Sequence, residues 1–288
     1  MNKLTKDTKI LIVGLGVMGG GYAAALSREG YDVSCITKEE CDVKYALEHG
    51  MIKYGTTEIE PALVGSADLV VFALYPGVFL EWIEKNQNLF KSGAIITDVT
   101  GVKSNIVDRV QSMLRPDIEF ISSHPMAGRE KSGVEFSNPD VFRGANYIVV
   151  PTEKNTADGI DTCRELGKTL GFARISTLSM EEHDKMIAFL SQLTHCIAVA
   201  LMTANATPGL EKYTGDSYRD LTRIAKINDA MWSELFMLNK DLLLAEMDAF
   251  SLSFNKLRDA LKNDDVETMR ELMRAATSRR ELFDKPEA

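Results

Sequence analysis

The segment at residues 122–133, SSHPMAGREKSG, places a histidine directly before a proline, among small residues and close to charged ones. Pro125 restricts the residue before it to an extended backbone, which limits the directions in which the His124 imidazole points. Histidine has the side-chain pKa nearest neutrality, so it is suited to accept a proton. His124 is therefore the candidate general base. An ordinary polar loop without a chemical role is the alternative, and the position of the segment in the fold decides between the two.

A second informative stretch is ILIVGLGVMGG at residues 10–20, in which three glycines follow an apolar run in GxGxxG order. The first glycine permits a tight turn, the second lets backbone approach a pyrophosphate, and the third lets a helix pack against a strand. The helix that follows offers free N–H groups to the phosphates. This pattern predicts a dinucleotide site formed by Gly14, Leu15, Gly16, Val17, Met18 and Gly19.

The end of the second apolar run bears on which dinucleotide binds. NAD-binding proteins place an acid there for the ribose hydroxyls, whereas this chain has Thr37 followed by Lys38. A hydroxyl and a cation suit a 2′-phosphate, so we expect NADP rather than NAD. The alternative is a solvated Lys38, with Glu39 or Glu40 binding the ribose.

The elements that must position these residues follow from the apolar pattern. Apolar runs with helical stretches between them indicate a parallel sheet covered on both faces, the Rossmann-type doubly wound α/β fold. The predicted strands are 9–13, 32–37, 68–74, 94–99, 119–122, 146–150 and 172–176. After residue 177 only helical patterns remain, at 179–205, 217–227, 229–262 and 265–283. We therefore predict a dinucleotide domain at 1–177 and an all-helical substrate and dimerisation domain at 178–288.

Composition limits the partners. The net charge of -9 disfavours a nucleic-acid partner but permits a small anionic substrate held by local cations. The start of the chain lacks a signal-type apolar run, the apolar stretch 196–202 is too short to span a bilayer, and the four cysteines have no metal-like spacing. We expect a cytoplasmic protein with reduced thiols, no membrane partner and no metal. Helices such as 236–254 are apolar on more than one face, which predicts a homodimer.

Ligands of open parallel sheets bind beyond the carboxyl ends of the strands. The segment TDVTGVKS at 97–104, whose Thr100 is expected to contact the cofactor, and the His124 segment both follow predicted strands and so meet at that edge. In the helix 179–205, Asp184, Ser191 and His195 project within roughly 40° of one another at about 100° per residue. A polar stripe on an apolar helix indicates contact with water or a ligand.

Cations for an anionic substrate come from SYRDLTRIA at 217–225. Arg219 and Arg223 are four residues apart, so both lie on one face of a helix. The planar guanidinium matches a carboxylate with two hydrogen bonds. For Arg219 a solvated surface charge is an equal alternative.

These motifs together resemble the prephenate/arogenate dehydrogenase family of tyrosine biosynthesis, and the resemblance covers nearly the whole chain. Besides the glycines, it rests on DVTGVKS (98–104), HPMAG-x-EKSG (124–133), HD (183–184), SQLTH (191–195), YRDLTRIA (218–225) and MW (231–232). The resemblance implies a Rossmann domain, a helical dimerisation domain, and oxidative decarboxylation of prephenate or arogenate with hydride transfer to NAD(P).

The resemblance also implies roles for individual residues. His124 matches the catalytic histidine that engages the ring hydroxyl, and Arg223 matches the substrate-binding arginine. Gln192 and His195 match a stretch that lines the substrate pocket. Many relatives carry a serine where this chain has Gly101, so the missing hydroxyl is expected from Thr100, Ser123 or water. Apart from the resemblance, a second role for Arg219 besides substrate binding is an ion pair with Glu130 or Asp184, which would then gate the mouth of the site.

Two other functions fit parts of the pattern. An NADP-linked β-hydroxyacid or imine-reducing enzyme would use a lysine on the first long helix, for which Lys185 is the candidate. A dinucleotide-sensing dimer without catalysis would need the glycines but no arginines facing a histidine.

Overall fold

The computed structural model describes residues 4–128 and 131–284. The chain forms two compact units, Met1–Asn239 and Lys240–Ala288. The change from strands to helices near residue 177 lies inside the first unit, because the helices that follow it pack with the sheets as far as Asn239.

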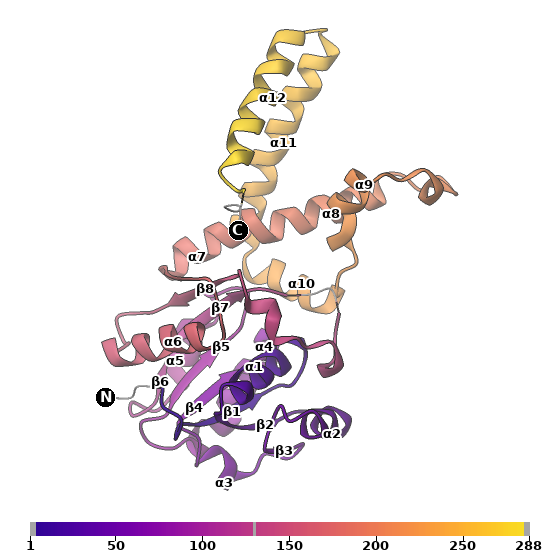
Figure 1. Cartoon of the computed structure of the whole chain (residues 1–288). Coiled ribbons are helices and arrows are strands. Elements are labelled where there is room, and N and C mark those ends of the chain that lie inside the picture. The colour runs from indigo at the N-terminus through magenta and orange to yellow at the C-terminus, as the bar shows by residue number, and fades with distance from the viewer. Residues whose placement is uncertain (1–3, 129–130, 285–288) are drawn as a thin grey trace. The chain divides into compact units, whose positions relative to one another are not determined.

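The first unit is built on a six-stranded parallel sheet with the order β3-β2-β1-β4-β5-β6 (Figure 1). Its strands are β1 (Lys9–Val13), β2 (Asp32–Ile36), β3 (Tyr54–Thr56), β4 (Leu69–Phe72), β5 (Ile95–Asp98) and β6 (Glu119–Phe120). The short, partly exposed edge strand β3 was not predicted, because its sequence YGT contains no apolar run. The strand order reverses between β1 and β4, and the crevice at such a point is where doubly wound sheets bind dinucleotides.

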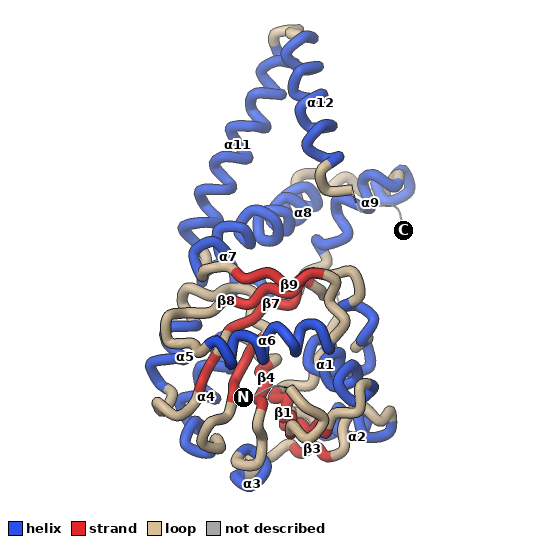
Figure 2. The backbone as a smooth tube through the Cα atoms, turned by 60° about the vertical axis from the view of Figure 1, so that its left-hand side comes forward, coloured by secondary structure: helices blue, strands red, loops and turns tan. Residues whose placement is uncertain are grey.

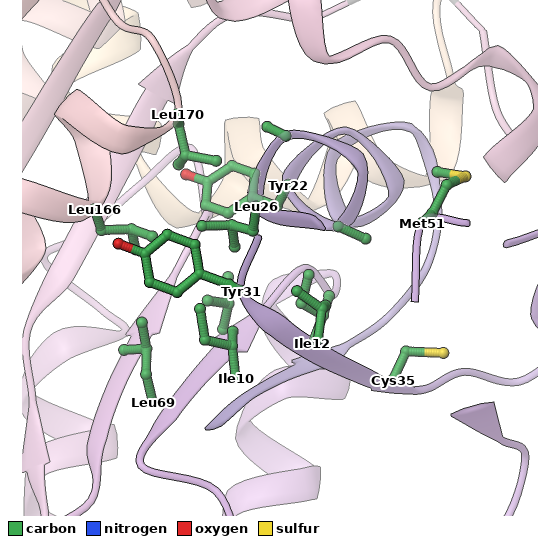
Figure 3. Close-up of a cluster of buried hydrophobic side chains, with 14 of the residues drawn as sticks. Ile10, Ile12, Tyr22, Leu26, Tyr31, Cys35, Met51, Leu69, Leu166 and Leu170 are labelled. Carbon is green, nitrogen blue, oxygen red and sulfur yellow. The ribbon is translucent and has the colours of Figure 1, made fainter. Parts of the chain in front are cut away.

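Helices cover both faces of this sheet. Alternate side chains of β1 point to opposite faces: Ile10 and Ile12 pack toward α1, α2 and α6, whereas Leu11 and Val13 pack toward α3, α4 and α5. Figure 3 shows the first cluster, where residues of β1, α1 and α6 meet. The helices are α1 (Val17–Arg28), α2 (Glu40–Glu48), α3 (Pro61–Val64), α4 (Pro76–Asn86), α5 (Val107–Met113) and α6 (Ala157–Thr169). The predicted doubly wound fold is confirmed.

A second, three-stranded sheet follows β6 in the chain and contains His124 (Figure 2). It consists of β7 (Ser122–Met126), β8 (Asn146–Val150) and β9 (Arg174–Thr177), with β7 antiparallel and β9 parallel to β8. The single strand predicted at 119–122 is therefore divided at Ile121, and the polar loop expected around His124 is a strand. Pairing with the apolar strand β8, where His124 lies opposite Ile148, overrides the polar sequence of β7.

The helices after β9 differ from the predicted runs, most clearly at a π-turn and at Asn239. They are α7 (Met180–Ile187), the π-helix η4 (Ala188–Leu193), α8 (Thr194–Thr203), α9 (Asp216–Thr222), the 3-10 turn η6 (Arg223–Ala225) and α10 (Asp229–Leu238). The π-turn breaks the spacing of 100° per residue, so the predicted stripe from Asp184 to His195 does not face one way. The run 229–262 is interrupted at Asn239, a buried residue whose Nδ2 donates to the Asp184 carbonyl and to Gln192 Oε1, at 3.0 and 2.8 Å.

Among the described residues, the helical run Met180–Thr203 is long and apolar enough to cross a membrane by length and composition alone. Core helices of soluble proteins meet the same criterion. Polar side chains of this run, including His183 and Gln192, are buried in contacts with other elements of the first unit. The expected absence of a membrane partner stays a prediction.

The second unit is a helical hairpin of α11 (Lys240–Lys262) and α12 (Val266–Glu281), which lie side by side (Figures 1 and 2). The Asp265 carboxylate accepts a hydrogen bond from the Thr268 N–H and caps α12. Leu252, Phe254 and Leu261 of α11 are each more than 60% exposed in the single chain. A two-helix hairpin cannot bury such residues on its own.

Candidate active site

A cleft of about 780 Å³ opens in the first unit, beyond the carboxyl ends of β1, β4 and β5. Gly16, Val17 and Met18 line it at the start of α1, and His124, His195 and Trp232 line it from β7, α8 and α10. A volume of this order accommodates a small ligand together with part of a cofactor. The structure thus brings the glycine turn and the candidate base to one cavity.

The glycine turn has the backbone that a dinucleotide needs. Gly14 has a φ of +95°, and a Cβ there would lie 2.5 Å from the Ala73 carbonyl oxygen. A Cβ on Gly19 would lie 1.9 Å from the Gly14 oxygen, whereas one on Gly16 would meet no protein atom within 4 Å. Gly14 and Gly19 therefore keep the turn closed, and Gly16 leaves backbone accessible from the cleft. No side chain caps the start of α1 and its first turn contains no acid, so these N–H groups fit a pyrophosphate.

The residues at the end of β2 lie outside the cleft lining. Thr37 is buried, and the exposed Lys38 ammonium is 3.6 Å from Glu39 Oε1. An exposed ion pair of this kind is weak. Lys38 therefore remains available to a ribose substituent. Leu15, which was also predicted at the dinucleotide site, is a buried core residue.

His124 is half-buried and forms the end of a chain of hydrogen bonds. Its Nδ1 is 2.8 Å from His183 Nε2, and His183 Nδ1 is 2.7 Å from Asp184 Oδ1. A carboxylate only accepts, so His183 Nδ1 carries a proton. Burial lowers the pKa of His183, which keeps the ring neutral and makes its Nε2 an acceptor. His124 therefore donates from Nδ1, and its Nε2 has no proton.

The electrostatics around His124 favour the neutral imidazole. Burial lowers the pKa of His124 well below its ordinary value, and the positive charge of Lys103 acts in the same direction. A charge on His183 would lower this pKa further, but that ring is neutral at neutral pH. A neutral ring is the form that accepts a proton, so His124 is in its base form at neutral pH.

Asp184 does not lie at the mouth of the cleft, where it was expected to act as a gate. Its side chain is fully buried, and it accepts hydrogen bonds from the Lys103 N–H at 2.9 Å and the Ser104 N–H at 2.7 Å. Burial opposes ionisation, but the hydrogen bonds from His183 and Ser104 hold the pKa of the Asp184 carboxyl below its ordinary value. Asp184 thus fixes the loop after β5 against α7, and the expectation that it gates the mouth was wrong.

A buried polar network lies behind His124. The Lys103 ammonium is fully buried and donates to the Ser123 carbonyl at 2.7 Å and to Asp98 Oδ2 at 3.1 Å. The Ser123 hydroxyl donates to the Asp98 carbonyl at 2.9 Å and accepts from the Tyr147 hydroxyl at 2.7 Å. The Ser123 hydroxyl is therefore held in this buried network, which corrects its expected role at the substrate. Thr100 does line the cleft, but its hydroxyl donates to Asp98.

The helical wall of the cleft contains His195 and Gln192. The His195 ring lies on Trp232 with centroids 3.7 Å apart, and its Nδ1 donates to the Ser191 carbonyl at 2.8 Å. Gln192 lines the cleft, but its Nε2 donates to the Leu235 carbonyl at 2.9 Å and its Oε1 accepts from Asn239. The Gln192 amide therefore joins α10 to the π-helix. The stacked rings of His195 and Trp232 form part of the cleft wall.

The two arginines are not held on one helical face. Arg219 donates to Asp216 at 2.7 Å, and both side chains are exposed, so the expected pairing with Asp184 was wrong. Glu130, the other expected partner, lies outside the described residues. Arg223 begins the turn η6, and its neighbours Ile224 and Lys226 line the cleft. Arg223 itself is not among the lining residues, but it directly precedes Ile224 in the chain.

Gly101 and His124 both line the cleft and lie close to each other. A Cβ there would lie 3.6 Å from Leu235 Cδ1 and 4.0 Å from His124 Cε1, which is ordinary contact. We expect Gly101→Ser to fold normally and to raise kcat/KM by about 2- to 10-fold, because its hydroxyl adds one hydrogen bond beside the substrate hydroxyl that the family resemblance places at His124. Gly101→Ala is the matched control, since it adds the carbon without the hydroxyl. An equal gain in both variants would exclude the hydroxyl as the cause.

Two residues of the site were not assigned a role from the sequence. His183 entered the sequence comparison only as part of the HD motif, although it directly precedes Asp184 and is the link to His124. Trp232, one of two tryptophans, is recognisable only as part of the MW motif. Lys185, the candidate base of an alternative enzyme class, is exposed and outside the cleft lining.

Comparison with known proteins gives matches along the chain. Residues 22–176 match the family model described as prephenate dehydrogenase, nucleotide-binding domain, and residues 179–275 match prephenate dehydrogenase, dimerization domain. A prephenate dehydrogenase of Bacillus subtilis (strain 168) is 28% identical over 276 residues, covering 93% of this chain and 74% of the relative. A cyclohexadienyl dehydrogenase of Zymomonas mobilis is 29% identical over 271 residues, covering 91% of each.

A solved structure is similar over almost the full length. It is prephenate dehydrogenase from A. aeolicus in complex with hydroxyphenyl propionate and NAD+. That protein is 30% identical, has a TM-score of 0.89, and the match covers 98% of this chain and 100% of that chain.

Proposed function

Because the chain belongs to the prephenate dehydrogenase family, and is thus an NAD(P)-dependent prephenate/arogenate dehydrogenase, we propose that it prefers prephenate to arogenate. The two substrates differ at the side chain, which carries a keto group in prephenate and an ammonium in arogenate. The described residues that line the cleft include Lys131 and Lys226 but no aspartate or glutamate. An ammonium group would lack a carboxylate partner there, and desolvating an unpaired charge is costly. This charge pattern is the observation that favours the keto acid.

The test is the ratio of kcat/KM values for prephenate and arogenate, followed by absorbance of the reduced dinucleotide at 340 nm. A ratio above about 10 in favour of prephenate is expected, which corresponds to about 1.4 kcal/mol of discrimination. Equal or higher efficiency with arogenate would overturn the preference.

His124 is the base in the proposed reaction. The ring carbon that bears the hydroxyl also carries the hydrogen that leaves as hydride, and the bound dinucleotide supplies the acceptor for it. As the hydride leaves, His124 Nε2 takes the hydroxyl proton and a ring ketone forms. The ring carboxylate then leaves as CO₂, its bonding electrons make the ring aromatic, and the phenolate oxygen regains the proton from His124. The unprotonated Nε2 inferred from the hydrogen-bond chain supports this role.

We further propose NADP as the preferred cofactor. The exposed Lys38 at the end of β2, with only a weak partner in Glu39, supports this preference. Lys38→Glu is expected to lower kcat/KM with NADP by about 10-fold or more and to leave NAD nearly unchanged, because a contact between a cation and a phosphate is lost. Lys44→Glu on the exposed surface of α2 is the matched charge control. A wild-type enzyme that favours NAD would refute the preference.

The dimerization domain at 179–275 and the exposed apolar side chains of α11 support a homodimer. Light scattering at micromolar concentration should give twice the chain mass of 31.9 kDa. Leu252→Glu together with Phe254→Glu should shift the mass to that of the single chain, because charges at an apolar interface are not compensated. Glu246→Gln, an exchange at a partly exposed polar position of α11, should leave the mass unchanged. A single-chain mass for the wild type would refute the homodimer.

A further inference from the structure

The pair His183 and Asp184 lies behind His124, away from the cleft. Both side chains are fully buried, and neither lines the cavity. They therefore act on the substrate only through His124. The distances of 2.8 and 2.7 Å are those of well-formed hydrogen bonds.

We propose that His183 and Asp184 are positioning residues that keep the His124 proton on Nδ1, so that Nε2 faces the cleft as an acceptor, and that they stabilise the imidazolium formed during the reaction. This inference rests on the proposed role of His124 as the base. The two nitrogens of an imidazole ring point in different directions, so a hydrogen bond at one of them sets both the tautomer and the ring orientation. Without an acceptor at Nδ1, part of the His124 population would carry its proton on Nε2 and could not take another there.

The charges around the pair fit this role. The Lys103 ammonium lies near His124 and disfavours a second positive charge, but Asp98 is paired with it at 3.1 Å. Asp184 supplies the negative charge that reaches His124 through His183. When Nε2 takes a proton, the hydrogen bond from Nδ1 to His183 becomes charge-assisted and stronger.

Asp184 is anchored so that the pair cannot turn away. Its two oxygens accept from the Lys103 and Ser104 N–H groups, and Asn239 donates to its carbonyl at 3.0 Å. Residues from β7, α7 and the loop after β5 thus hold the base in one orientation before substrate binds, which avoids reorganisation during the reaction.

The direct test is ¹⁵N NMR of the full chain labelled at histidine, at neutral pH and without substrate. The chain has four histidines, and the His124→Asn variant assigns the His124 signals. A protonated Nδ1 and an unprotonated Nε2 on His124 are expected. A proton on Nε2, or an equal mixture of tautomers, would overturn the proposal whatever the activity of the enzyme.

Two variants of His183 give a kinetic test. His183→Gln still presents an acceptor to His124 Nδ1 through its side-chain carbonyl, so its kcat should stay within about 10-fold of wild type. His183→Phe presents no acceptor, and its kcat should be about 10- to 100-fold lower than that of His183→Gln. This loss is a part of the rate enhancement that a positioned base contributes. In His183→Phe the acid limb of kcat/KM should also move to lower pH, because the imidazolium has lost its partner. Dinucleotide affinity should be unchanged in both. Equal kcat in the two variants, in folded protein, would overturn the proposal. If His183→Phe does not fold, the tautomer measured in the wild type decides.

The kinetic and NMR results separate two failures. If His124→Asn keeps its activity, the proposed base is wrong, yet the tautomer measurement still reports on the His183 hydrogen bond. If His124→Asn is inactive but the wild-type His124 tautomer is not the expected one, only the positioning role fails.

Discussion

His124→Asn is expected to reduce kcat by about 100- to 10,000-fold, the range that a positioned general base contributes. Asparagine preserves polarity at the site but takes up no proton. Since burial lowers the pKa of His124, the wild-type base is unprotonated at neutral pH, and its activity should fall only below the ordinary histidine pKa of 6.5. Steady-state kinetics from pH 5 to 9 measure both effects.

The affinity for the dinucleotide should remain close to wild type in this variant, because the glycine turn is formed by β1 and α1 rather than by β7. Titration of intrinsic fluorescence with the oxidised cofactor checks this. His49→Asn is the matched control, since His49 bonds to the Tyr45 carbonyl at 2.8 Å at the end of α2, outside the cleft lining. A kcat of more than a tenth of wild type in His124→Asn would contradict the assignment.

Arg223→Gln is expected to raise KM for prephenate by about 10- to 150-fold, with a smaller effect on kcat. This factor corresponds to the free energy that hydrogen bonds to a charged group contribute. We propose that Arg223 binds a substrate carboxylate, because its turn η6 brings Ile224 and Lys226 into the cleft lining. Arg223→Lys should recover only part of the affinity, since an ammonium does not reproduce the two parallel hydrogen bonds of a guanidinium.

Arg219→Gln is the matched control for this prediction. It removes the same charge four residues away, from a side chain that is exposed and paired with Asp216. KM should change by less than about twofold. Equal effects of both arginine variants on KM would mean that substrate binding depends only on the total positive charge, and not on a contact with Arg223. A large effect of Lys226→Gln without one from Arg223→Gln would transfer the carboxylate site to Lys226.

The parts of the site that could be predicted are those whose signal is local. The glycine turn is one example, since Gly14 and Gly19 are required by backbone geometry within one strand, one turn and one helix. Strand β1, with the sequence KILIV, is another, because a strand buried on both faces must be apolar throughout. In each case the residues that decide the structure are neighbours in the chain.

Other features depend on contacts between distant residues. His124 was expected in a polar loop because SSHPM has a low strand propensity, but pairing with β8 places it in a strand. The π-turn at Ala188–Leu193 and the break at Asn239 depend on hydrogen bonds between α10 and the cleft wall. No period in the sequence reports such contacts.

The sequence by itself determined the doubly wound sheet, the dinucleotide turn and the choice of His124 as the candidate base, because period, glycine placement and residue type are local properties. Only the tertiary structure placed Asp184 behind His183, moved Ser123 into a buried network and paired Arg219 with Asp216. The physical reason is that a hydrogen bond depends on a separation of about 3 Å in space, whatever the separation of its partners along the chain. His124 and His183 are 59 residues apart in the chain, and folding alone brings their nitrogens to 2.8 Å.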